Sequence, residues 1–164
     1  MDNAVRTNPS GRPTRIPFDP GAVHGSLFRA FLDARREFGG GTPALVDGDG
    51  RVLTYDELTR ASFALGHALK QGTHRDEKIG ILLPTGMGAA IAFLAISAYG
   101  RVPTMLNFTS GNADLKSAIR TAQVRRVVTA RRFIELGKLE NAEAAIAEAA
   151  EPIYLEDVRA RLSL

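Results

Sequence analysis

Apolar residues in the first third of the chain recur at helical spacing and then flank a polar turn. From Ser26 to Phe38 they appear at every third or fourth position, which predicts an amphipathic helix that ends at the glycines of 39–41. Two short strand-like runs, Ala-Leu-Val at 44–46 and Arg-Val-Leu at 51–53, lie on either side of the Asp-Gly-Asp-Gly turn at 47–50. Glycine tolerates positive φ, so this pattern predicts a β-hairpin.

The rest of the chain alternates between helical patterns and short apolar runs. Thr54 and Glu57 have the spacing of a capping box, which predicts a helix that continues to about residue 71. Beyond it we expect strands at 79–83, 102–106, 126–129 and 152–155, separated by helices at 88–99, 112–123 and 132–150.

This alternation predicts βαβ units, and therefore an α/β fold in which a parallel sheet carries helices on both faces. The N-terminal helix and the β-hairpin precede the sheet. Residues 23–164 are expected to form this α/β unit. Residues 1–22 are polar and rich in proline, which predicts a flexible tail or linker.

One uncharged stretch, from Ile79 to Gly100, is long enough to cross a membrane. Pro84 and the glycines at 86 and 88 divide it into a short strand and a separate helix, so we interpret both parts as buried inside a soluble domain. The first 20 residues lack the apolar region of a signal peptide.

Composition removes several classes of chemistry. The chain has no cysteine, which excludes a disulfide scaffold, a zinc ribbon and a thiol nucleophile. His24, His67 and His74 do not share a helical face, so they are expected to be surface residues rather than metal ligands. The net charge of +3 is too small to indicate nucleic acid as a partner.

The glycine clusters resemble phosphate-binding loops only in part. The Gly-Met-Gly at 86–88 follows a predicted strand, but Ile91 occupies the third glycine position of a dinucleotide fingerprint, and no acidic residue follows at the required spacing. Close packing of helix on sheet is the preferred interpretation, and a nucleotide site is an alternative. The clusters at 39–42 and 109–111 do not continue into Gly-Lys-Ser or Gly-Lys-Thr.

Four arginines flank the predicted strand at 126–129: Arg125, Arg126, Arg131 and Arg132. Arginines at a sheet end are often simply solvated. The sharper alternative is a contact for a phosphate or an acidic partner, because arginine at the start of a helix is unfavourable unless an anion is near.

Several segments resemble the beginning of the AMP-binding, adenylate-forming enzyme family. They are Thr54-Tyr55-Asp56-Glu57-Leu58, the strand 79–83 followed by Pro84, and Tyr99-Gly100-Arg101-Val102-Pro103 together with Asn107. Thr85 stands where the family usually has asparagine, and Phe108 follows Asn107 in place of proline. The runs 100–109 and 129–133 are similar to the acyl-acyl-carrier-protein synthetase half of bifunctional lysophospholipid acyltransferases.

The resemblance implies a ligase whose N-terminal α/β subdomain is formed by residues 23–164. In this family a fatty carboxylate attacks ATP, assisted by Mg²⁺, to give acyl-adenylate and pyrophosphate. The thiol of CoA or of an acyl carrier protein then takes the acyl group. The family's lysine-bearing ATP loop, adenine-contacting segment, ribose-binding aspartate and catalytic lysine do not occur in this sequence, so no catalytic residue is assigned.

Several expectations follow from the resemblance. The chain alone is expected to be inactive and to hold neither ATP nor Mg²⁺. Asn107 and Thr109, at the end of a predicted strand, are candidate pocket-lining residues. An incomplete sheet would expose apolar surface and promote self-association. The implied location is the cytoplasm, with membrane association of a full-length protein as the alternative. The rival hypothesis is a stand-alone, non-catalytic module that docks an acidic acyl carrier protein through the four arginines.

Overall fold

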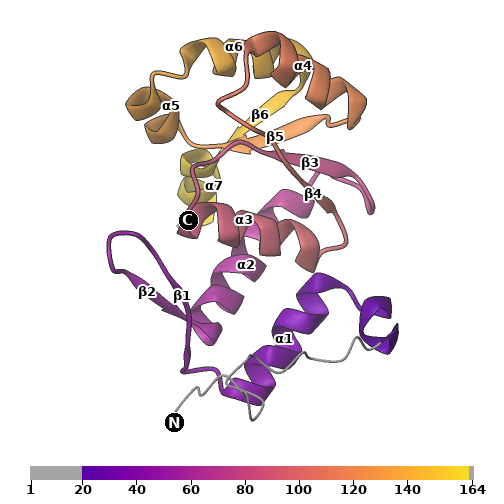
Figure 1. Ribbon diagram of the computed structural model, residues 1–164, viewed down its shortest axis with the longest axis vertical. Coiled ribbons are helices and arrows are strands. Elements are labelled where there is room, and N and C mark those ends of the chain that lie inside the picture. Colours follow the sequence, from indigo (N-terminus) through magenta and orange to yellow (C-terminus); the bar gives the residue numbers. More distant parts are fainter. Residues whose placement is uncertain (1–19, 163–164) are drawn as a thin grey trace, which may run out of the picture.

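The computed structural model describes residues 20–162, so residues 1–19 of the predicted tail lie outside the described range. Figure 1 shows the hairpin and the first helix below a sheet that is covered by helices. The elements in chain order are a 3-10 helix Pro20–His24, α1 Leu27–Phe38, β1 Pro43–Val46, β2 Val52–Thr54, α2 Tyr55–Lys70, β3 Lys78–Ile81, α3 Met87–Ala98, β4 Val102–Met105, α4 Asn112–Thr121, β5 Arg126–Thr129, α5 Arg131–Gly137, α6 Glu140–Ala149, β6 Glu151–Tyr154 and α7 Leu155–Leu162.

Four of the strands form one parallel sheet in the order β4-β3-β5-β6. The chain passes from β3 to β4 on one side and then returns across β3 to β5 on the other, so the direction of winding reverses at β3. Strands β1 and β2 form a separate antiparallel hairpin. The predicted hairpin and the predicted parallel sheet are both confirmed.

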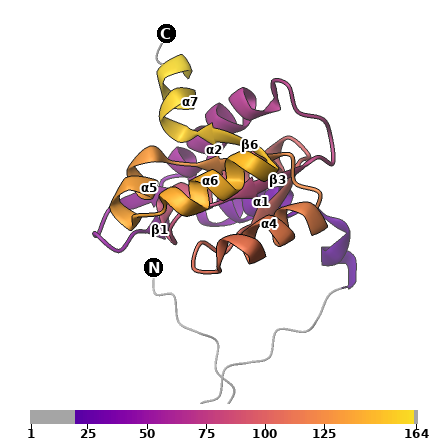
Figure 2. The ribbon, with the colours of Figure 1, turned by 90° about the horizontal axis from the view of Figure 1, so that it is seen from above.

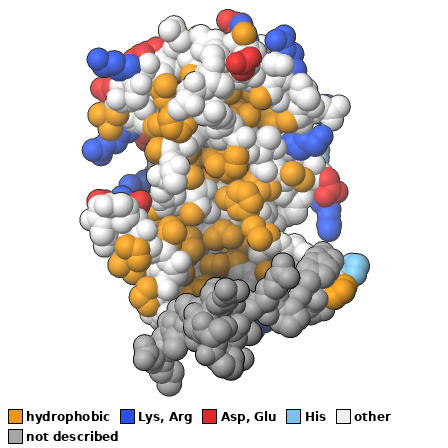
Figure 3. Space-filling view, in the orientation of Figure 1, with side chains coloured by type: hydrophobic (Ala, Val, Ile, Leu, Met, Phe, Trp, Pro, Cys, Tyr) orange, Lys and Arg blue, Asp and Glu red, His pale blue; other side chains and the backbone are white. Residues whose placement is uncertain are grey.

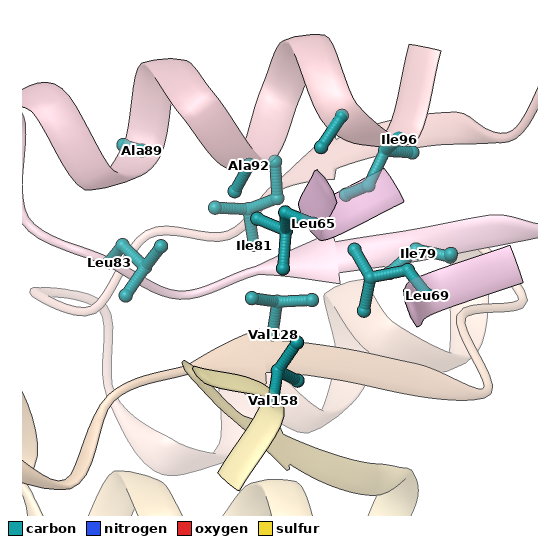
Figure 4. Close-up of a cluster of buried hydrophobic side chains, with 11 residues drawn as sticks. Leu65, Leu69, Ile79, Ile81, Leu83, Ala89, Ala92, Ile96, Val128 and Val158 are labelled. Atoms are coloured by element: carbon teal, nitrogen blue, oxygen red, sulfur yellow. The ribbon is translucent and has the colours of Figure 1, made fainter. Parts of the chain in front are cut away.

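Helices cover both faces of the parallel sheet, and each face has its own buried cluster. On one face α2, α3 and α7 enclose a cluster in which Leu65, Ile81 and Val128 meet (Figure 4). On the other face α4, α5 and α6 pack against Leu82 and Val127. Figure 2, which views the molecule from above, shows α4, α5 and α6 in front of the sheet. This is the α/β architecture that the alternating pattern predicts.

The cap residues of the first two long helices are those that the sequence indicates. The Ser26 hydroxyl accepts a hydrogen bond from the Arg29 amide at 3.2 Å. Thr54 Oγ1 accepts from the Glu57 amide at 3.3 Å, and Glu57 Oε2 accepts from the Thr54 amide at 2.9 Å, which completes the capping box. The hydrogen bonds from Thr54 lower the pKa of the Glu57 carboxyl.

Strand β4 is an open edge of the sheet, and a proline limits what can pair with it. Val102 donates its amide to Glu77, and Leu106 donates to Ile81, so alternate residues of this strand bond to β3. Pro103 therefore lies at a position that faces the open edge, where it has no N–H to offer. A proline at this position hinders the addition of another strand.

The long helix predicted at 132–150 is wrong, because the chain forms two shorter helices there. Lys138 has φ of 51°, in the left-handed region, and the Leu139 amide donates to the Ile134 carbonyl at 2.9 Å. This closes α5 with a reversal of the kind that often terminates helices. Ile134 and Leu139 both pack into the cluster under α4 and α6, which explains the turn between the two helices.

The C-terminal helix α7 was not predicted from the sequence. It follows β6 directly, carries Glu156 and Asp157 in its first turn, and buries Val158 against α2 and the sheet. Acidic residues in a first turn favour a helix through its dipole. Within residues 20–162, no helix has the length and apolar character needed to traverse a bilayer.

Candidate functional site

The carboxyl ends of the parallel strands are where ligands bind in open α/β sheets, most often where the winding reverses. Here the ends of β3 and β5 lie beside each other at such a reversal. The segment after β3 leads through Leu83, Pro84 and Thr85 into α3, and the segment after β5 leads into α5. The carboxyl end of the sheet, between β3 and β5, is therefore the expected position of a functional site.

A groove of about 600 Å³ separates the hairpin from α3 and β4. We call it the hairpin groove. Leu45 and Val46 of β1 form one wall, and Ala89, Phe93 and Met105 form the other. The lining is mostly apolar, with Asp47 and Thr85 as its polar side chains, which suits hydrocarbon better than phosphate.

A second groove, of about 480 Å³, lies between the ends of β3 and β5, and we call it the switch-point groove. Its apolar lining includes Phe133, Leu136 and Leu155, and Arg132 and Arg51 also line it. Thr85 and Asp47 line both grooves, but no hydrogen bond joins the Thr85 hydroxyl to the Asp47 carboxylate among the described residues. These two grooves therefore offer binding surface without a hydrogen-bonded pair of nucleophile and base.

Asp47 lines both grooves and was missed as a functional residue by the sequence analysis, which placed it in a solvated turn. Its side chain is only 20% exposed. One carboxylate oxygen accepts from the Gly48 amide at 2.9 Å, and the other accepts from the Met87 amide at 3.3 Å. Asp47 therefore caps the N-terminus of α3, although 40 residues separate it from Met87 in the sequence.

This cap also explains Gly86. A Cβ added at residue 86 would lie 3.0 Å from Asp47 Oδ1, so glycine allows the carboxylate to approach the helix closely. A phosphate at the same helix end would meet a carboxylate that already accepts from Met87. With Asp47 in place, the Met87 amide is not free for a nucleotide phosphate. The expected close packing of helix on sheet does not explain the two glycines either, because Gly86 faces the Asp47 carboxylate and nothing lies within 4 Å of a Cβ at Gly88.

The two candidate pocket residues, Asn107 and Thr109, interact with each other in an exposed loop after β4. Asn107 Oδ1 accepts from the Thr109 amide at 3.0 Å and from the Thr109 hydroxyl at 2.8 Å. This local turn satisfies their polar groups. Neither residue lines the hairpin groove or the switch-point groove, and their role as pocket residues stays a prediction.

The structure does not bring the four arginines together. Arg125 and Arg126 lie at the start of β5, whereas Arg131 and Arg132 lie beyond its end. Arg126 is held by Glu77 at 2.6 Å and by Glu151 at 3.0 Å. Within residues 20–162, the guanidinium groups of Arg125 and Arg132 have no hydrogen bond or ion pair.

Arg131 belongs to a cluster that ties α5 to the C-terminal helix. Its guanidinium donates to both carboxylate oxygens of Asp157, at 2.6 and 2.7 Å, and lies 4.0 Å from the centre of the Tyr154 ring. The Arg131 guanidinium lowers the pKa of the Asp157 carboxyl. The Tyr154 hydroxyl donates to Glu143 at 2.5 Å, and this bond together with burial raises the pKa of Tyr154 to about 12.

Metal chemistry finds no support in the described range. No group of three or more histidine, aspartate or glutamate side chains within residues 20–162 is placed to hold an ion. The side chains of His24, His67 and His74 are all exposed, as expected for surface residues.

Comparison with known proteins agrees with the fold and with the resemblance in the sequence. The family model described as AMP-binding enzyme matches residues 32–161. The acetyl-coenzyme A synthetase of Streptomyces coelicolor is 30% identical over 146 residues, which cover 82% of this chain and 22% of that protein. The chain therefore belongs to the AMP-binding enzyme family.

Solved structures share the fold of this chain. The complex of VinN with 3-methylaspartate superposes with a TM-score of 0.70 at 22% identity, over 85% of this chain and 37% of VinN. The O-succinylbenzoate CoA synthetase MenE of Bacillus subtilis, in complex with ATP and magnesium ion, gives 0.67 at 16% identity, over 78% of this chain and 33% of MenE. The chain spans about a third of the length of these two proteins, and the fold class predicted from the sequence is confirmed.

Proposed function

We propose that this chain is the N-terminal α/β subdomain of an ATP-dependent acid–thiol ligase and that it is inactive alone. Membership of the AMP-binding family, over 130 of 164 residues, is the observation that carries the proposal. The full enzyme would use ATP and Mg²⁺ to convert a carboxylic acid to an acyl-adenylate. It would act in the cytoplasm and pass the acyl group to a thiol.

The finer proposal is that the acid is a fatty acid and that the acceptor is CoA or an acyl carrier protein. The support is the likeness of segments 100–109 and 129–133 to the acyl-acyl-carrier-protein synthetase branch. The apolar lining of the hairpin groove is compatible with a hydrocarbon substrate but does not select one.

A pyrophosphate-release assay tests the proposal. The purified chain is incubated with ATP, Mg²⁺ and acetate, benzoate or fatty acids of increasing length, with a complete acetyl-CoA synthetase as positive control. We expect no acid-dependent pyrophosphate from the chain alone, because the segments that bind ATP are absent from its sequence. Acid-dependent turnover by these 164 residues would overturn the proposal.

We further propose that the apolar face of the chain is covered in the complete enzyme and causes self-association when it is not. Figure 3 shows apolar side chains gathered over α3 and the hairpin. Val46 is 64% exposed and Met105 is 56% exposed, on opposite walls of the hairpin groove. Large apolar patches that are exposed to solvent commonly cause protein molecules to associate.

Light scattering across a concentration series tests this second point. We expect the parent chain to self-associate and the double variant Val46→Asp with Met105→Asp to be more monomeric. Leu27→Asp is the matched control, because Leu27 is 58% exposed but lies on α1, away from the groove. A parent chain that stays monomeric at all concentrations would contradict the idea.

The second candidate function is a module that docks an acidic acyl carrier protein. The observation in its favour is the unpaired guanidinium of Arg132 beside the switch-point groove. Titration with an acyl carrier protein at low and high salt distinguishes the docking module from the ligase subdomain. Electrostatic docking weakens as the salt concentration rises. Loss of binding in Arg132→Ala but not in Arg125→Ala would favour the module, and an absence of binding would remove it.

A further inference from the structure

Hydrogen bonds join the β1–β2 hairpin to the rest of the described chain at its base and at its tip. Its base adjoins α2, where the Tyr55 amide donates to the Thr42 carbonyl at 3.0 Å. Its tip reaches the N-terminus of α3 through Asp47. Figure 1 shows the hairpin projecting beside the body. Leu45 and Val46 of β1 and Phe93 of α3 line the hairpin groove between them.

The tip contact is polar and specific, whereas its surroundings are apolar. Asp47 Oδ2 accepts from the Met87 amide, and Oδ1 faces the glycine at residue 86. Leu83, Ala89 and Met87 surround this contact in both grooves. The two grooves share the wall formed by residues 83–89, and Asp47 is the hairpin residue that lines both of them.

We propose that Asp47 is a latch that holds the β1–β2 hairpin closed against α3, and that the hairpin swings about its base when the latch is released. Opening would join the hairpin groove to the switch-point groove at the carboxyl end of β3. The latch rests on the hydrogen bond to Met87 and on the space left by Gly86, and it does not depend on the proposed ligase activity.

The same turn supplies a matched control. Asp49 is also an acidic turn residue, and both carboxylates pair with Arg51, at 2.7 Å for Asp49 and 3.7 Å for Asp47. Among the described residues, Asp49 has no hydrogen bond or ion pair with α3. Removal of either carboxylate changes the charge of the turn by the same amount. Only Asp47→Ala removes the cap of α3, so a difference between the two variants reports the latch rather than the charge.

The chain is well suited to a distance measurement. It has no cysteine, so an introduced pair can be labelled without background. Gly48 at the tip and Gly88 on α3 both have open space where a Cβ would lie. Spin labels on Gly48→Cys and Gly88→Cys therefore report the separation of the hairpin tip from the helix.

We expect one narrow distance distribution in the labelled parent and a broader distribution, extended to longer distances, when Asp47→Ala is added. Asp49→Ala should leave the distribution unchanged. Asp47→Asn should fall between them, because its amide oxygen can still accept from Met87. An unchanged distribution in Asp47→Ala would overturn the latch.

A second measurement covers the case in which Asp47→Ala folds poorly. Gly86→Ala places a Cβ 3.0 Å from Asp47 Oδ1 and also strains the backbone at residue 86, whose φ is 157°, whereas Gly88→Ala is the control because nothing lies within 4 Å of that position. Hydrogen exchange of the Met87 amide should become about tenfold faster in Gly86→Ala and stay near the parent value in Gly88→Ala. Equal exchange in the two variants would refute the latch independently of any change in global stability.

Discussion

The contact between α2 and α3 gives the sharpest test of the fold, through Gly66. These two helices share the most extensive contact between elements of the described chain. A Cβ at residue 66 would lie 2.5 Å from the Ala95 carbonyl oxygen and 2.6 Å from the Tyr99 ring. The ring can rotate away, but the carbonyl belongs to the backbone of α3 and cannot move without the helix.

The structure sets the expected cost of Gly66→Ala. The Cβ would be about 0.9 Å closer to the carbonyl oxygen than the 3.4 Å at which ordinary contact begins, so the helices must separate. Overpacking of this kind costs about 1–3 kcal/mol, and a backbone obstacle places it at the upper end. The higher helix propensity of alanine adds about 1 kcal/mol to the free energy of unfolding and offsets part of this cost. The net destabilisation should be about 2 kcal/mol, or roughly 4–8 °C in Tm for a domain of this size.

Urea denaturation followed by circular dichroism measures this change, with Gly88→Ala as the control. Residue 88 lies in α3 with nothing within 4 Å of an added Cβ, so that variant should be stabilised by about 0.5–1 kcal/mol. If Gly66→Ala were as stable as the parent, the close approach of α2 and α3 would be wrong.

Three further predictions use the buried polar groups. Ser62 is fully buried on α2, and its hydroxyl has no hydrogen-bond partner among the described residues. Ser62→Ala should therefore raise the free energy of unfolding by about 1 kcal/mol in the same denaturation assay. A loss of stability would show that the hydroxyl has a partner. Arg126→Ala should lower the free energy of unfolding by about 2–3 kcal/mol, because the buried Glu77 carboxylate would lose its ion-pair partner. The neighbouring Arg125→Ala should change stability little, and equal effects of the two variants would contradict the pairing. The raised pKa of Tyr154 stabilises the folded state while the phenol is protonated, so this contribution is complete below pH 10 and is lost as the pH rises towards 12. Between pH 9 and 12, the Tm should therefore fall more steeply with pH in the parent than in Tyr154→Phe. The same pH dependence of Tm in the two proteins would refute the contribution of Tyr154.

Local sequence signals predicted most of the elements, and non-local contacts account for what was missed. The hairpin at 43–54 follows from its own turn, and the capping box at Thr54 follows from residues three apart. The bond between Asp47 and Met87 joins two separate local patterns, so neither pattern shows it. Helix α7 has eight residues and one buried side chain, Val158, which is too short for a periodic signal.

Two errors had signals that the sequence did contain. Gly137 interrupts the alanine-rich pattern at 132–150, and the helix ends there. The arginines could also have been separated in advance. The strand at 126–129 runs along the sheet from its amino end to its carboxyl end. Residues before and after the strand therefore lie at opposite ends of it. Only the tertiary partners of Arg126 and Arg131 required the structure.

The capping of α3 by Asp47 also bears on where a nucleotide can bind in a complete enzyme. A helix N-terminus can satisfy its amides with a carboxylate from the same chain or with a phosphate, and the first excludes the second at the same groups. In this chain Asp47 already accepts from Met87, at the helix end whose glycines most resemble a phosphate loop. If the proposed ligase activity is correct, its ATP must be held by residues outside this helix end for as long as the hairpin is closed, and in that state α3 packs on the sheet and anchors the hairpin.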